Sequence, residues 1–174
     1  MILIAIREGD AKDKTDKDVM FWTRGKFVHA EIVVMKGHIV SYGAWEGESP
    51  SFKARTPTEW MPQDQYKFFY VPLSEEKEKH AWAFLERMRN ANLQYRLGWE
   101  CAIPEMVVRC IENDIDVHQD PSTWGPIFCS QVVLLFLRKM FVHPLLHTHS
   151  SHCSPTLLHQ ICVNMRLPQV SSPF

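Results

Sequence analysis

Two β-branched segments separated by a short turn constrain the fold of this chain most strongly. Residues 27–34 read Phe-Val-His-Ala-Glu-Ile-Val-Val, and residues 38–44 read His-Ile-Val-Ser-Tyr-Gly-Ala. β-Branched and aromatic residues favour strands, and Lys36-Gly37 supplies turn chemistry between them. We therefore predict an antiparallel hairpin, and with it a fold that contains a sheet.

The alternation along residues 27–34 assigns their side chains to two faces, because side chains in a strand point alternately to opposite sides. One face is wholly apolar and consists of Val28, Ala30, Ile32 and Val34. We expect this face to pack on the core. The other face carries His29 and Glu31, with Phe27 and Val33. An imidazole and a carboxylate on one face can act as a general base and its orienting partner, although a polar outer face is also typical of an antiparallel strand.

Further strands are expected on both sides of the hairpin. The N-terminal segment, Met1-Ile-Leu-Ile-Ala-Ile, is apolar and predicts a first strand. Residues 67–72 predict another, and Pro72, which has no amide donor, either ends that strand or places it at an edge. Residues 45–65 are rich in proline and polar side chains, which predicts a long irregular connection.

Four helices follow from capping signals and apolar spacing. Ser74 is an N-cap followed by two glutamates, and residues 104–112 predict a shorter helix with proline in its first turn. A third helix is expected to begin near Cys129, and Ser154-Pro155 predicts the start of a fourth. Apolar residues at helical spacing mark the buried faces of the first helix (Ala81, Trp82, Leu85, Met88) and the third (Val132, Val133, Phe136, Leu137, Met140).

Length and composition indicate a single domain over residues 1–174. Of these residues, 45% are hydrophobic and 22% are charged, as is usual for one compact core. The formal net charge is -1 and no basic stripe is evident, so we expect no nucleic acid partner. The apolar runs are much shorter than the roughly 18 residues of a membrane-spanning helix, so we expect no stable membrane insertion.

Cysteine usage and the N-terminal segment point to the cytoplasm. The chain has five cysteines and no Cys-x-x-Cys pair, which is typical of a reducing compartment. The apolar segment after Met1 is too short for a secretory signal. We therefore expect a cytoplasmic protein, and its oligomeric state stays open.

Cys129 is the main candidate for a nucleophile, with His29 as its partner. A thiol in the first turn of a helix lies near unpaired N–H groups at the positive end of the dipole, and both favour the thiolate. The same N–H groups can stabilise a developing oxyanion. The alternative is a structural cysteine, since cysteine is among the residues most often buried.

A second group of histidines and cysteines lies between residues 143 and 162. These residue types suit zinc, but their spacing lacks two matching ligand pairs, and Pro144 disfavours one helical face shared by His143 and His147. We expect a solvated loop there, with no metal and no other cofactor.

Three aromatic residues are candidates for substrate contacts. Trp45 and Trp60 belong to the predicted irregular connection, where their rings can line a groove. Tyr42 lies near the end of the second hairpin strand, next to that connection. The alternative is that these rings are part of the core.

The order of four motifs resembles a known superfamily. His29-Ala-Glu31 lies on an early strand, and Phe128-Cys129-Ser130-Gln131-Val132-Val133 opens a late helix. Asn92-Leu-Gln-Tyr95 is similar to a helix-end tyrosine segment, and Ser154-Pro-Thr-Leu-Leu158 is similar to a helix start after the cysteine helix. Together they resemble the circularly permuted, NlpC-type papain-like superfamily, over about residues 25–165. That group includes YiiX-like bacterial proteins, poxvirus relatives and the lecithin-retinol acyltransferase branch.

The resemblance implies an α+β fold, in which a small antiparallel sheet carries the histidine strand and the cysteine begins a late helix packed on it. It also implies that Cys129 is the nucleophile, that His29 is the general base, and that a thioester acyl-enzyme forms. Relatives carry a polar third residue on the strand after the histidine, where this chain has Ser41. We favour Glu31 for this role, because it shares the face of His29, and keep Ser41 and Glu46 as alternatives.

The expected activity is a cysteine protease or amidase that cleaves an amide, peptide or isopeptide bond in a protein or peptide substrate. One alternative is an acyltransferase or lipid-ester hydrolase of the same fold. The other is a catalytically silent binding module, because fold alone does not establish function. A virus-encoded enzyme acting in its host cell and a bacterial cytosolic enzyme both fit these features.

Overall fold

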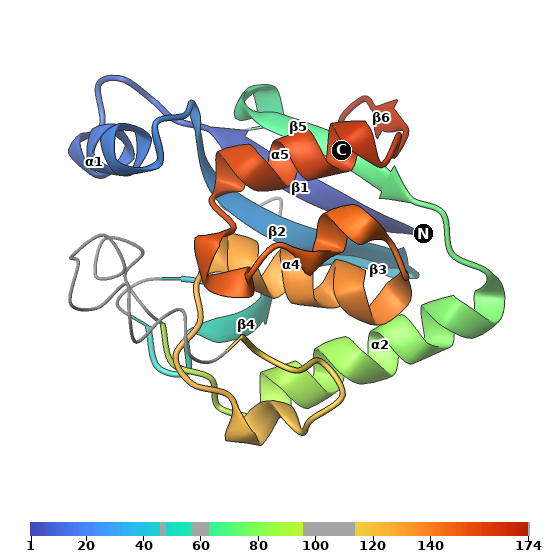
Figure 1. Cartoon of the computed structure of the whole chain (residues 1–174). Coiled ribbons are helices and arrows are strands. Elements are labelled where there is room, and N and C mark those ends of the chain that lie inside the picture. Colours follow the sequence, from blue (N-terminus) through green and yellow to red (C-terminus); the bar gives the residue numbers. More distant parts are fainter. Residues whose placement is uncertain (46–47, 57–62, 96–113, 174) are drawn as a thin grey trace.

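A six-stranded antiparallel sheet forms the centre of the protein, in the order β4-β3-β2-β1-β5-β6 (Figure 1). The computed structural model describes residues 1–45, 48–56, 63–95 and 114–173. Its strands are β1 (Ile2–Glu8), β2 (Phe27–Lys36), β3 (His38–Ala44), β4 (Phe52–Arg55), β5 (Tyr66–Val71) and β6 (Gln169–Val170). With the helices described below, the fold is of the α+β class, as predicted.

The predicted hairpin is confirmed by β2 and β3, which pair from Ile32 opposite Tyr42 to Lys36 opposite His38. Gly37 makes the turn at a φ of +74°, a backbone conformation that residues with a side chain rarely adopt. The first strand is confirmed as β1. Strand β5 ends just before Pro72, and it pairs with β1 on one side and β6 on the other. Pro72 therefore ends the strand and does not mark an edge.

Helices α4 and α5 cover one face of the sheet, and α2 lies beside α4 (Figure 1). The helices of the described residues are α1 (Lys14–Thr23), α2 (Glu75–Asn90), α4 (Cys129–Met140) and α5 (Pro155–Asn164). Ser74 and Ser154 cap α2 and α5 with their side chains, as the sequence predicts. The helix expected over residues 104–112 lies outside the described residues.

Two predictions about individual segments are wrong. Residues 45–65 are not wholly irregular, because β4 lies within them and pairs with β3, and a 3-10 turn covers Gln63–Gln65. Phe27 does not share the face of His29. The pairing of β1 with β2 shifts between Arg7, opposite His29, and Glu8, opposite Phe27, and this bulge turns Phe27 into the main core. There its ring stacks on His159 with ring centroids 4.3 Å apart.

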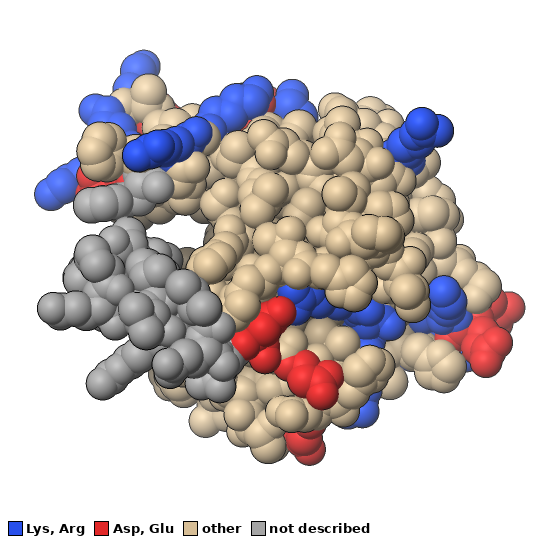
Figure 2. Space-filling model, viewed as in Figure 1, with Lys and Arg blue, Asp and Glu red and all other residues tan. Residues whose placement is uncertain are grey.

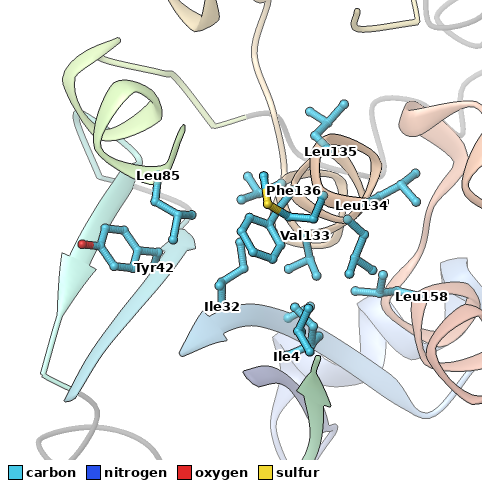
Figure 3. Close-up of a cluster of buried hydrophobic side chains, with 14 of the residues drawn as sticks. Ile4, Ile32, Tyr42, Leu85, Val133, Leu134, Leu135, Phe136 and Leu158 are labelled. Carbon is cyan, nitrogen blue, oxygen red and sulfur yellow. The ribbon is translucent and has the colours of Figure 1, made fainter. Parts of the chain in front are cut away.

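The core surrounds α4, which is buried on nearly all sides. Figure 3 shows side chains of α4 pointing toward Ile4 and Ile32 of the sheet on one side and Leu85 of α2 on another. The sequence predicts one buried face, but every residue from Cys129 to Leu137 is buried. A helix enclosed in this way holds its first turn in a fixed position relative to β2.

The far face of the sheet is also buried around Glu31, where the sequence allowed a polar outer face. A second apolar cluster lies there, made of Leu3, Ala5, Val33, Tyr66 and Phe68. Glu31 lies on this face and is 0% exposed. Its carboxyl group therefore needs partners inside the protein, because an unpaired buried carboxylate is strongly unfavourable.

Candidate active site

Cys129 is the first residue of α4, and the start of this helix is fixed by its own polar side chains. The N-cap residue, Phe128, makes no side-chain capping bond. Ser130 donates its hydroxyl to the carbonyl oxygen of Cys153, and Gln131 Nε2 donates to Ser150 Oγ at 3.0 Å. These bonds hold the first turn against the segment that precedes α5.

The sulfur of Cys129 lies against β2 and is surrounded by donors. It accepts hydrogen bonds from the backbone N–H groups of Ala30 and Ser130, and it contacts the imidazole of His29. Burial by itself raises the pKa of this thiol, but the positive charge of His29 and the three hydrogen bonds together lower it below its ordinary value. The geometry therefore favours a thiolate at Cys129.

His29 is held between two acidic groups. Burial by itself lowers the pKa of an imidazole, but Cys129 and then Glu31 raise the pKa of His29 to about 10. Its Nε2 lies 3.2 Å from Glu31 Oε1, within ion-pair distance but without the alignment of a hydrogen bond. A protonated His29 next to a Cys129 thiolate is therefore the favoured state.

Glu31 is fixed by donors on both sides of β2. Tyr66 of β5 donates its hydroxyl to Oε1 at 2.9 Å, and Ser41 of β3 donates to Oε2. Gly43 lies close by, since a Cβ placed on it would be 3.1 Å from the Glu31 side chain and 3.0 Å from Trp45. The strand therefore carries its smallest residue where Glu31 and Trp45 leave no room for a side chain.

The structure thus brings Cys129, His29 and Glu31 together in one chain of contacts, in which Cys129 and Glu31 are buried and the His29 side chain is 13% exposed. Ser41, an alternative for the third position, donates its hydroxyl to Glu31 Oε2. Glu46, the other alternative, lies outside the described residues.

This arrangement has the parts that nucleophilic acyl transfer needs: a thiolate at a helix N-terminus, an imidazolium in contact with it and a carboxylate beside the imidazole. Searches against family models, curated proteins and solved structures give no match.

The three aromatic candidates have different locations. Trp45 lies beside the site, with its ring centroid 6.0 Å from that of His29. The guanidinium carbon of Arg55 lies over the Trp45 ring, 4.2 Å from its centroid, in a cation–π contact. Tyr42 is 2% exposed within the main core, and its hydroxyl donates to Glu86. It faces away from Glu31, so the structure does not support a substrate contact by Tyr42. Trp60 lies outside the described residues.

The histidine-rich segment 143–162 forms two short 3-10 turns and α5. His149 and His152 lie close together, with ring centroids 5.1 Å apart. In the ranges that the structure describes, no three His, Cys, Asp or Glu side chains are grouped so that they could hold a metal ion. Within the same ranges, no helix combines the length and apolar character that a bilayer crossing requires.

Tyr66 is the site residue that sequence reasoning missed. It begins β5 and lies opposite Arg7, which in turn lies opposite His29. Only the register of three strands reveals this proximity. A partial signal was available, because Tyr66 directly precedes the strand predicted over residues 67–72 and alternates with Phe68 and Tyr70.

Proposed function

We propose that this protein is a cysteine hydrolase of the permuted papain-like type, which cleaves an amide, peptide or isopeptide bond. One observation carries the proposal: the buried thiol of Cys129 begins a helix and contacts His29, whose Nε2 lies 3.2 Å from the fully buried Glu31. A structural cysteine needs neither a helix N-terminus nor an imidazole and carboxylate in series. The order of the elements also agrees with the permuted type, since the histidine strand precedes the cysteine helix.

In the first half of the reaction, the Cys129 thiolate attacks the carbonyl carbon of the substrate and forms a C–S bond. The carbonyl oxygen becomes an oxyanion, which first-turn N–H groups of α4 can stabilise. His29 then donates its proton to the leaving nitrogen, the C–N bond breaks, and an amine departs. The products of this half are a thioester on Cys129 and a neutral His29.

In the second half, a water molecule replaces the amine. Neutral His29 takes a proton from the water as its oxygen attacks the thioester carbon. The C–S bond breaks, the carboxylic acid leaves, and the thiolate and imidazolium are restored. Glu31 keeps the imidazole ring oriented through both halves and balances its positive charge.

The proposal is tested by trapping the thioester. The protein is incubated with panels of peptide amides and isopeptides, quenched in acid, and examined by intact mass and peptide mapping. We expect an acyl adduct on Cys129 that hydroxylamine removes, together with turnover that is lost in Cys129→Ala. Cys162→Ala is the matched control, because Cys162 is also a buried free cysteine and its substitution leaves the adduct in place.

Turnover that persists in a folded Cys129→Ala protein would contradict the proposal. A panel without turnover, combined with tight binding of one member, would instead favour the binding module. Transfer of the trapped acyl group to an added amine or alcohol in preference to water would favour an acyltransferase.

A further inference from the structure

Tyr66 reaches the candidate site from two strands away. Strand β1 lies between β2 and β5, and its Arg7 lies opposite His29 on one side and opposite Tyr66 on the other. The Tyr66 side chain extends across this gap, so that its hydroxyl donates to Glu31 Oε1 at 2.9 Å. This is the same oxygen that lies 3.2 Å from His29 Nε2.

The Tyr66 hydroxyl is held as a donor. The residue is 6% exposed, and burial together with the charge of Glu31 raises the pKa of its phenol well above the usual value. The proton therefore stays on the phenol at working pH and is available to the carboxylate. A hydrogen bond to a buried charged group is among the stronger ones in proteins.

The other charged groups around Glu31 are few. His29 faces it from β2 itself, and Cys129 of α4 lies beyond His29. Arg7 of β1 acts on Tyr66, but its guanidinium is engaged by Asp16 of α1 in two hydrogen bonds of 2.7 and 2.8 Å. Tyr66 and Ser41 are thus the neutral donors that the described structure offers to Glu31.

We propose that Tyr66 is a positioning residue for the catalytic pair: its hydroxyl holds Oε1 of Glu31 against His29. The proposal rests on the proposed function of Cys129 and His29. Without the hydroxyl, the buried carboxylate loses one of its donors and is held less firmly against the imidazole. A carboxylate that turns away from His29 gives the imidazolium less counter-charge, and the thiolate–imidazolium pair is weakened.

The test is the pH midpoint of iodoacetamide alkylation at Cys129, located by peptide mass spectrometry, in wild type and Tyr66→Phe. This midpoint reports the thiol pKa without the need for a substrate. We expect Tyr66→Phe to raise the midpoint by about one pH unit, which is a tenfold loss of thiolate below it. Once a substrate is identified, kcat should fall about tenfold with little change in KM.

Two variants separate positioning from packing. Tyr70→Phe removes a hydroxyl from the same face of β5, four residues away, and should keep the wild-type midpoint. A chain with 3-fluorotyrosine at position 66 keeps the donor and should also keep the low midpoint, which addresses the case in which Tyr66→Phe folds poorly.

A low midpoint that is the same in wild type and in folded Tyr66→Phe would overturn the role of Tyr66 and leave the proposed function intact. Loss of the low midpoint in the 3-fluorotyrosine protein would also overturn it. A wild-type midpoint equal to that of an ordinary thiol would instead reject the thiolate–imidazolium pair, and the role of Tyr66 with it.

Discussion

The Glu31 carboxylate lies 3.2 Å from His29 Nε2, although the two residues belong to the same strand. Two residues apart on a strand, His29 and Glu31 project in parallel, which does not by itself bring a carboxylate to an imidazole. The carboxyl group is held in place by two donors on other strands, Ser41 of β3 and Tyr66 of β5. Neither contact can be read from local sequence, since each depends on strand register.

We predict that Glu31→Gln lowers the pKa of His29 by at least one unit from its value of about 10. The substitution keeps the shape of the side chain but removes the negative charge that favours the imidazolium. The measurement is an NMR titration of the His29 ring protons, assigned by comparison with His29→Ala. Glu86→Gln is the control, because Glu86 pairs with Tyr42 and Arg89 away from the site. An unchanged His29 titration in Glu31→Gln would show that the carboxylate does not act on the imidazole.

At the scale of elements, the parts with strong local signals are the ones that could be predicted. Strands β1, β2, β3 and β5 follow from apolar or β-branched runs, and helices α2 and α5 follow from serine caps. Helix α1 was missed because its sequence, KTDKDVMFWT, has no apolar stripe at helical spacing. Strands β4 and β6 are four and two residues long, so that their pairing partners, and not their own sequences, determine them.

Hydrogen bonds from Arg138 fix the segment between α4 and α5. Arg138 near the end of α4 donates to the carbonyl oxygens of Leu146 and Thr148, and it binds Asp114 through Nη1 at 3.0 and 3.1 Å. Asp114 also accepts from the backbone N–H of Ser150 at 2.9 Å. Burial by itself raises the pKa of the Asp114 carboxyl group, but these donors lower it below its ordinary value.

We predict that Asp114→Asn destabilises the protein by about 1 kcal/mol near pH 6, a modest figure because the carboxylate is partly exposed and screened. The folded-state pKa of Asp114 is the lower one, so this stability is present above the unfolded pKa of about 3.9 and is lost as pH falls through the folded value. Urea unfolding at pH 6 and about pH 2.5 should therefore show a difference from wild type only at the higher pH. Asp18→Asn, at an exposed position on α1, should show no difference at either pH. A deficit in Asp114→Asn that persists at the low pH would contradict this account.

At the scale of the whole molecule, the sheet and α4 form the frame that carries the site. Figure 2 shows that the face over α4 and α5 is mainly uncharged, with Lys and Arg side chains gathered at its borders. Beneath it, α4 fills the space between the sheet, α2 and α5. The sequence predicts this packing only in part, because periodicity indicates one buried face and does not show that two further helices enclose the other sides.

We predict that Val133→Ala lowers the free energy of unfolding by about 2–3 kcal/mol, since it removes buried methyl groups and leaves a cavity. Val133 is 0% exposed in the core. Val142→Ala is the matched control, because Val142 is fully exposed and should change stability by less than about 0.5 kcal/mol. Thermal melts should show Val133→Ala lower by roughly 5–10 °C. Equal melting temperatures for the two variants would contradict the central position of α4.

The central claim is that Cys129 is a thiolate because His29 is charged beside it. The most direct measurement is the pH dependence of iodoacetamide labelling at each cysteine in wild type, His29→Ala and His159→Ala. The last variant removes a histidine outside the site, whose pKa is lowered by burial and Lys26.

We predict that wild-type Cys129 labels with a pH midpoint well below the ordinary thiol pKa of about 8.5. Cys153 and Cys162 should not label in that pH range, because burial raises the pKa values of their thiols. His29→Ala should move the Cys129 midpoint to or above the ordinary value, and His159→Ala should leave it in place. A wild-type Cys129 midpoint near 8.5, or one that His29→Ala does not change, would contradict the account.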